Sequence, residues 1–180
     1  MIHRRAFLSG SLAVFTWPLA ARVARAQAGA EPAGTGALPP ATLRALEASP
    51  YVYVSPLLAG GRESTCHGEV WYGWIDGAVV LTTGTTTWKA RSIARGHDEA
   101  RIWVGDYGRW KTLTGRSEDF RAGPSFVARA RIVEDSALLD RLLRIFDKKY
   151  PDEIGRWRDR MRRGHASGER VLIRYRPHVG

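Results

Sequence analysis

Residues 79–95 read VVLTTGTTTWKARSIAR, and this stretch decides the fold of the chain. Its apolar and β-branched start, residues 79–83, is typical of a buried strand, which Gly84 then ends. Three threonines, residues 85–87, lead into residues 88–95, where apolar side chains recur at helical spacing. The sequence therefore predicts a strand, a hydroxyl-rich turn and a helix that begins within the turn.

The turn combines features that suit an anion such as a phosphate: hydroxyl groups, free backbone N–H groups and a helix N-terminus. Lys89 and Arg91 would add positive charge, and an arginine can hold two oxygens at once. The stretch contains neither the GxxxxGK[ST] spacing of a Walker loop nor a GxGxxG motif. An alternative stays open here, in which the threonines only end a strand and the basic residues behind them are solvated.

Residues 1–26 are predicted to be an export signal and not part of the folded domain. Arg4 and Arg5 stand before a modestly apolar stretch, and a small-x-small motif ends at Ala26. This pattern resembles a twin-arginine signal, by which bacteria export folded proteins, so the twin-arginine translocation machinery is an expected transient partner. The apolar stretch is too short and too broken for a stable membrane span. We expect cleavage after Ala26 or Ala28 and a periplasmic or secreted protein.

Residues 27–41 are rich in Ala, Gly and Pro and are predicted to be a flexible linker. Residues 42–177 are then long enough for one domain with its own core. The net charge of the whole chain is +10, and it falls to +6 without the four arginines of the leader. Because Lys and Arg are dispersed among acidic residues, and no nucleic-acid-binding module is present, nucleic acid is not an expected partner.

Cys66 is the only cysteine of the chain, so it cannot form an internal disulfide. His67 follows it directly, but neither residue has a companion at the spacing that metal sites use. We therefore expect a structural cysteine and no metal site.

Hydrophobic periodicity predicts several strands in hairpin succession, and the Asp76-Gly77 pair is the strongest hairpin signal. Without a regular βαβ alternation, this order indicates a mainly β fold with some α, a small barrel of six or so antiparallel strands with helices packed outside. The predicted strands are residues 51–55, 64–75, 79–83, 100–105, 124–133 and 170–176, with a further short strand at 110–113. The predicted helices are residues 43–48, 89–95, 136–149 and 152–163.

At this point the sequence resembles the pyridoxamine-phosphate-oxidase-like, split β-barrel flavin-binding superfamily. The resemblance is carried by residues 69–77 (EVWYGWIDG), 80–83 (VLTT) and 87–93 (TWKARSI), and it covers about residues 42–177. Its most specific piece is a strand that ends in Thr, a Ser or Thr four or five residues later, then Lys two residues after that and a short helix.

The resemblance implies that this turn binds the phosphate of FMN, or of a related deazaflavin, in a cleft between the two subunits of a homodimer. Trp88 stands where the oxidase has a basic residue, and its indole would stack on the cofactor or cover the cleft. His67 stands near the position of an arginine in the oxidase, on the strand that would pass under the isoalloxazine ring. Carried over by position, the phosphate-binding residues would be Thr82 or Thr83, Thr87, Lys89 and Arg91.

The leading functional prediction is an exported, homodimeric flavoprotein that oxidises or reduces a small-molecule substrate. No side chain stands out as a catalytic acid or base, so the catalytic residues remain unassigned and the chemistry is expected to come from the cofactor. Two alternatives stay open. One is a non-catalytic split-barrel protein that binds haem, a haem product or another ligand, and the other is a cofactor-free protein of the cell envelope.

Overall fold

The computed structural model describes residues 37–108 and 118–178, all within one compact unit, Ala33–Gly180. The export signal, most of the linker and the predicted strand at residues 110–113 lie outside the described residues. The helices are α1 (Pro40–Ala48), α2 (Trp88–Ala94), α3 (Ser136–Lys149), α4 (Pro151–Ala166) and the short 3₁₀ helix η1 (Asp119–Ala122). The strands are β1 (Tyr51–Pro56), β2 (Gly68–Trp71), β3 (Gly73–Ile75), β4 (Ala78–Gly84), β5 (Glu99–Val104), β6 (Ser125–Val133) and β7 (Arg170–Pro177).

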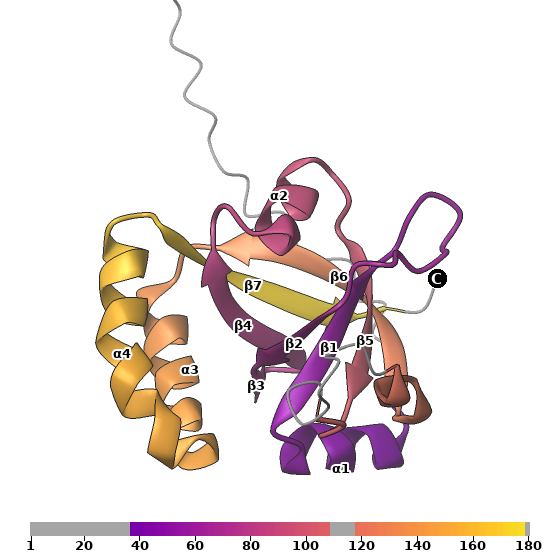
Figure 1. Ribbon diagram of the computed structural model, residues 1–180, viewed down its shortest axis with the longest axis horizontal. Helices are drawn as coiled ribbons and strands as arrows, with labels where there is room; N and C mark the ends of the chain where they lie inside the picture. The colour runs from indigo at the N-terminus through magenta and orange to yellow at the C-terminus, as the bar shows by residue number, and fades with distance from the viewer. Residues whose placement is uncertain (1–36, 109–117, 179–180) are drawn as a thin grey trace, which may run out of the picture. The chain divides into compact units, whose positions relative to one another are not determined.

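These strands form one antiparallel sheet in the order β2-β1-β5-β6-β7-β4-β3. The two edge strands, β2 and β3, are consecutive in sequence, so the chain itself joins the edges and the sheet curls into a nearly closed barrel (Figure 1). The predicted fold class, a small antiparallel barrel with helices outside, is therefore confirmed. No helix among the described residues combines the length and apolar character that crossing a bilayer requires.

The predicted continuous strand at residues 64–75 is wrong, because the chain changes its strand partner at Tyr72. Before this residue β2 pairs with β1, and after it β3 pairs with β4. The hydroxyl group of Tyr72 is buried and donates to the carbonyl oxygen of Leu46 at 2.7 Å, and the carbonyl of Ser49 lies at 3.1 Å. These long-range hydrogen bonds fix Tyr72 at the point where the strand is interrupted. The alternation of apolar residues in the sequence carries no sign of them.

Two hydrophobic clusters pack against opposite faces of the curled sheet. One fills the barrel with alternate side chains of β1 and β4–β7, such as Val54, Leu81 and Ile102. The other joins the outward side chains of Val80 and Leu172 to α3 and α4, which lie side by side along one side of the sheet (Figure 1). Successive residues of β4 therefore face the inside and the outside of the barrel in turn. The two threonines near the end of β4, Thr82 and Thr83, accordingly point in opposite directions.

Tyr150 links the two helices to the barrel wall and gives the first testable prediction. Its hydroxyl donates to the carbonyl oxygen of Pro50 and accepts the backbone N–H of Tyr72 at 3.3 Å, while its ring stacks on Trp71 at 4.2 Å. Removing the hydroxyl in Tyr150→Phe leaves two buried backbone groups without this partner, so we expect a loss of about 1–3 kcal/mol in the free energy of unfolding. Urea denaturation measures this loss.

Tyr175→Phe is the matched control, because Tyr175 is equally buried but its hydroxyl makes no hydrogen bond among the described residues. Its effect should stay within about 0.5 kcal/mol. Equal losses of unfolding free energy in Tyr150→Phe and Tyr175→Phe would show that the hydrogen bonds of the Tyr150 hydroxyl do not stabilise the fold.

Lys149, at the C-terminal end of α3, gives a pH-dependent prediction. Its ammonium lies 3.6 Å from the centroid of the Tyr72 ring, and burial lowers the pKa of Lys149 to about 8. The pKa of an unfolded lysine is about 10.4, so between about pH 8 and pH 10 the unfolded chain holds a proton that the folded chain has lost. The free energy of unfolding should therefore rise with pH across this window.

Urea titrations of the wild type and of Lys149→Met at several pH values check this sign. The wild type should gain stability relative to the variant as the pH rises above about 8. Burial raises the pKa of Tyr72 and of Tyr175, so both proteins should lose stability at more alkaline pH. Parallel pH profiles of the two proteins would contradict the assignment to Lys149.

Candidate functional site

The hydroxyl-rich turn joins the end of β4 to the start of α2, and two of its threonines meet there. The hydroxyl oxygens of Thr83 and Thr87 are 3.1 Å apart, and that of Thr87 lies 2.9 Å from the carbonyl oxygen of Gly84, to which it donates. Because a hydroxyl has a single proton, Thr83 donates to Thr87. The turn thus presents two linked hydroxyl groups, of which that of Thr83 is buried.

Trp88 and Lys89 follow the turn as the first two residues of α2. The Lys89 ammonium lies 4.6 Å from the centroid of the Trp88 ring, a cation–π distance. A β-carbon placed on Gly68 would lie 3.5 Å from both Lys89 Nζ and Trp88 Cζ2, so β2 begins beside this pair. The indole packs against the core of the barrel. The start of β2 therefore lies beside the two residues that follow the threonine turn.

The first turn of α2 contains no acidic residue, and Thr87 precedes it without a side-chain cap. Because α2 has only seven residues, its dipole is small, and the side chains of the turn would carry most of the attraction for an anion. The donors that the turn offers to phosphate oxygens are the ammonium of Lys89 and the first backbone N–H groups of α2, because the protons of the two hydroxyls go to Thr87 Oγ1 and to the Gly84 carbonyl oxygen.

Thr82 lies on the opposite face of β4 from Thr83, so the structure separates two residues that the sequence left as alternatives. Its Oγ1 is 2.8 Å from His165 Nε2, and Arg170 donates to the same Oγ1 from Nε and to the Thr82 carbonyl oxygen from Nη2, both at 3.2 Å. Sequence reasoning missed His165 and Arg170, because only the pairing of β4 with β7 and the packing of α4 bring them to this threonine.

Two further predicted residues have side chains with other surroundings. The ring of His67 packs on Phe120 at 4.8 Å, and its Nδ1 lies 3.8 Å from a carboxylate oxygen of Glu118. Arg91 lies on α2 with an exposed side chain. Of the seven predicted residues, Thr83 and Thr87 are joined by a hydrogen bond, and Trp88 and Lys89, which follow Thr87 in the chain, contact each other beside Gly68. Thr82 faces the other side of β4, the ring of His67 packs on Phe120, and the side chain of Arg91 is exposed.

The cavities on the two faces of β4 differ greatly in volume. The cavity between α2 and the barrel, which Trp88 and Lys89 help to line, holds only about 10 Å³ and admits no more than a water molecule. On the outer face of the sheet, an apolar groove of about 260 Å³ has Thr82 as its polar member. Its other lining residues are Val70, Trp71, Phe146, Trp157 and Met161.

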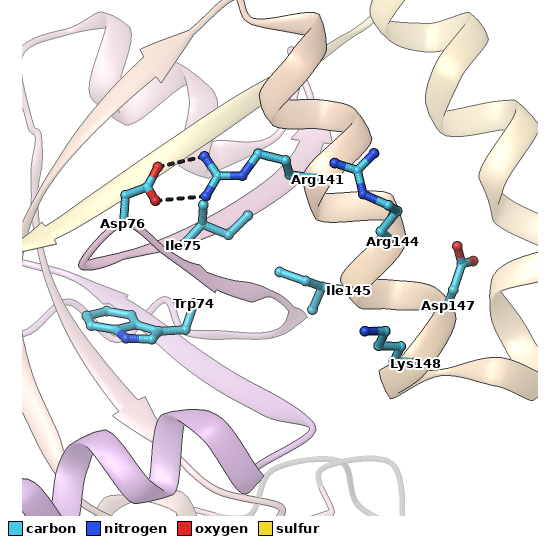
Figure 2. A pocket seen from close by; sticks show the side chains of 8 residues that line it. All are labelled: Trp74, Ile75, Asp76, Arg141, Arg144, Ile145, Asp147 and Lys148. Atoms are coloured by element: carbon cyan, nitrogen blue, oxygen red, sulfur yellow. Dashed lines mark hydrogen bonds and ion pairs between the residues drawn. The ribbon is translucent and has the colours of Figure 1, made fainter.

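A third cavity, of about 510 Å³, lies between the β3–β4 hairpin and α3 (Figure 2). Arg141 donates two hydrogen bonds of 2.7 Å to the carboxylate of Asp76, which ties the hairpin turn to the helix. Trp74 and the cationic side chains of Arg144 and Lys148 line the same cavity. None of the predicted site residues lines it, so this cavity is separate from the threonine turn.

No protein-family model and no curated protein sequence matches this chain, but solved structures do. HutZ, the heme storage protein from Vibrio cholerae, has a TM-score of 0.51 and 16% identity over 79% of this chain and 92% of its own. A conserved hypothetical protein from Mycobacterium tuberculosis has a TM-score of 0.53 and 20% identity over 79% and 82%. ChuZ from Campylobacter jejuni has a TM-score of 0.50 and 10% identity over 76% and 51%.

Matches at these low identities show a shared fold alone. The chain is a split β-barrel protein.

Proposed function

We propose that this protein binds a flavin phosphate, FMN or a deazaflavin, at the threonine turn, and that it is a flavin-dependent oxidoreductase acting on a small molecule. The observation that carries the proposal is the pair of linked hydroxyls of Thr83 and Thr87, 3.1 Å apart, at the start of α2, whose second residue is Lys89. The split-barrel fold supports it, because the resembling superfamily uses this turn for the same group.

The residues of the turn fit a phosphate in charge and in donor type. Lys89 would supply the positive charge, and the first amides of α2 would bind further oxygens. The hydroxyl of Thr87 would join them by turning its proton from the Gly84 carbonyl oxygen to the phosphate. The absence of an acidic residue in the first turn of α2 removes a source of repulsion. Bound here, the flavin ring would supply the hydride or electron transfer, while this chain holds and orients it.

The narrow space beside Trp88 supports a position of the ring outside the barrel wall and not within it. A cavity of about 10 Å³ cannot take an isoalloxazine ring, so the ring would lie against the start of β2, next to Gly68. We propose that a second copy of the chain covers this surface in a homodimer, which would exclude water from the ring.

The apolar groove on the outer face favours a second candidate, a haem-binding protein without catalysis. Five apolar side chains line the groove, and His165, a possible axial ligand, is bonded to Thr82 at its polar end. HutZ, which shares the fold, is named as a heme storage protein. In this chain, however, His165 Nε2 is already engaged with the Thr82 hydroxyl at 2.8 Å, and haem ligation would have to break this bond.

An absorption spectrum of the mature protein, followed by denaturation and identification of the released chromophore, tests the proposal. Release of FMN or a deazaflavin, at about one equivalent per subunit, is the expected result. An intense Soret band would instead favour the haem candidate. A colourless protein that also takes up neither added flavins nor haem would overturn both and leave the cofactor-free envelope protein.

We further propose that the protein reaches the periplasm, or the medium, already folded. The support is the twin arginine before the apolar stretch and the small-x-small motif at Ala26. Sequencing the N-terminus of the exported protein should give a start at residue 27 or 29. Replacing Arg4 and Arg5 together by lysine should abolish export.

A further inference from the structure

Arg170, the first residue of β7, has a partly buried guanidinium group that the flavin proposal does not use. Its described hydrogen bonds go to a single residue: Nε donates to Thr82 Oγ1 and Nη2 to the Thr82 carbonyl oxygen, both at 3.2 Å. A guanidinium has five N–H donors, so these bonds use two of them. No described residue accepts a hydrogen bond from the remaining three, which are therefore available to a ligand.

Within residues 37–108 and 118–178, no carboxylate forms an ion pair with Arg170. Its charged neighbour is instead Arg160, and burial together with this second cation lowers the pKa of Arg170. A guanidinium removed from water is costly unless an anion compensates it. A bound anion would therefore stabilise the guanidinium of Arg170, which no carboxylate of the described residues compensates.

The space for such an anion is a cavity of about 520 Å³ between α3, α4 and the start of β7. Arg170 and His165 both line it, together with Thr85 on the loop after β4. A volume of this size suits a small organic molecule.

The lining of this cavity also includes three acidic residues, and none of them forms an ion pair with Arg170. Asp140 forms an ion pair with Arg162 at 2.8 Å, and Asp135 caps α3 by accepting the backbone N–H of Leu138 at 2.9 Å. Glu134 is exposed at the rim. Arg170 therefore faces the cavity without a carboxylate of its own.

His165 is arranged as a second donor. Because Thr82 Oγ1 accepts from Arg170, its own proton is available for His165 Nε2 at 2.8 Å, which places the ring proton of a neutral His165 on Nδ1. Burial and the charge of Arg170 lower the pKa of His165, which keeps the ring neutral at pH 7. An anion bound beside Arg170 would offset the charge of Arg170 and thereby raise the pKa of His165.

Gly164 makes room for this arrangement. A β-carbon at residue 164 would lie 2.6 Å from Cγ of Arg170 and 2.7 Å from its Cδ, so any other residue would push the side chain of Arg170 aside. A glycine inside a helix costs about 1 kcal/mol relative to alanine, and close approach of Arg170 is the physical reason for it here.

We propose that the cavity between α3, α4 and the start of β7 is a second anion-binding site, in which Arg170 and His165 hold the carboxylate or phosphate group of a small organic molecule. The site is distinct from the Thr83–Thr87 hydroxyl pair, because Thr82 and Thr83 point to opposite faces of β4, although Thr85 of the same turn lines the cavity. A planar guanidinium suits both oxyanions, since it can bind two oxygens at once.

Calorimetric titration of the mature protein with benzoate and with inorganic phosphate, at low ionic strength, tests the proposal. Saturable binding of either probe is expected, and the tighter probe identifies the oxyanion. Arg170→Gln should weaken binding about tenfold or more, as expected for loss of a charged hydrogen-bonding partner. Gly164→Ala should also weaken it, although the charge of the protein is unchanged.

Arg163→Gln is the matched control, since it removes the same charge from an exposed position of α4 that does not line the cavity. Its dissociation constant for the probe should stay within about twofold of the wild-type value. Lys89→Ala should also keep probe binding, which separates this site from the flavin phosphate. An NMR titration of the His165 ring should show its pKa rising when the probe binds.

Absence of saturable binding of both probes would overturn the proposal. Equal losses in Arg170→Gln and Arg163→Gln would overturn it as well, because the effect would then be one of net charge. Failure of Arg170→Gln to fold leaves Gly164→Ala as the deciding variant, and unchanged affinity in that variant would count against the site.

Discussion

Lys89→Ala should lose most of its affinity for FMN, by about ten- to a hundredfold. The ammonium is the cation nearest to the hydroxyl pair in sequence, and a hydrogen bond to a charged group contributes about 1.5–3 kcal/mol. The loss should appear as a higher dissociation constant in a titration that follows quenching of flavin fluorescence. Riboflavin, which lacks the phosphate, should bind the wild type and the variant equally weakly.

Arg95→Ala is the control for this prediction, because it removes one positive charge from the other end of α2. Its affinity for FMN should stay within about twofold of the wild type at physiological salt. Thr87→Val should weaken FMN binding as well, since it removes a hydroxyl group at nearly constant volume. Unchanged FMN binding in both Lys89→Ala and Thr87→Val would rule out the turn as the phosphate site.

Phe146→Ala should cause the largest loss of stability, about 3–5 kcal/mol. Phe146 is fully buried between α3 and the sheet. Its ring packs edge-on against two aromatic rings, with centroid distances of 5.7 Å to Trp71 and 5.3 Å to Tyr150. Truncation would remove both contacts and leave a cavity where the helix pair meets the barrel. Because a domain of this size is stable by only about 5–15 kcal/mol, urea denaturation should show a much lower midpoint.

Trp157→Ala provides the comparison on the neighbouring helix. The side chain of Trp157 is 41% exposed, so its loss should cost about 1 kcal/mol or less. Phe146→Leu, which keeps most of the volume, should fall between the two variants. Equal effects of Phe146→Ala and Trp157→Ala would mean that α3 and α4 are not held to the sheet by this cluster.

Most strands and helices could be predicted from the sequence, because their signals are local. Apolar alternation in β6 and the broad apolar stripe of α3 recur at the periods of a strand and a helix. Asp76 and Gly77 both have positive φ angles, 49° and 69°, as a two-residue hairpin turn of this type requires. The strand-turn-helix order of residues 79–95 and its threonine–lysine pattern were predictable for the same reason.

The break at Tyr72 was not predictable in this way. Residues on both sides of it alternate as in one strand, and the change of partner depends on hydrogen bonds to Leu46, Ser49 and Tyr150, which are distant in sequence. The same limit applies to the anion cavity, since His165 and Arg170 reach Thr82 across 83 and 88 residues.

The class of fold and the existence of the threonine turn followed from the sequence alone, since both depend on residues close together in the chain. Only the tertiary structure decided which threonine belongs to the turn. Alternation along a strand places Thr82 and Thr83 on opposite faces, but it does not say which face meets α2 and which meets α4. That choice follows from the curl of the sheet, whose inner face holds one core and whose outer face holds the helix pair.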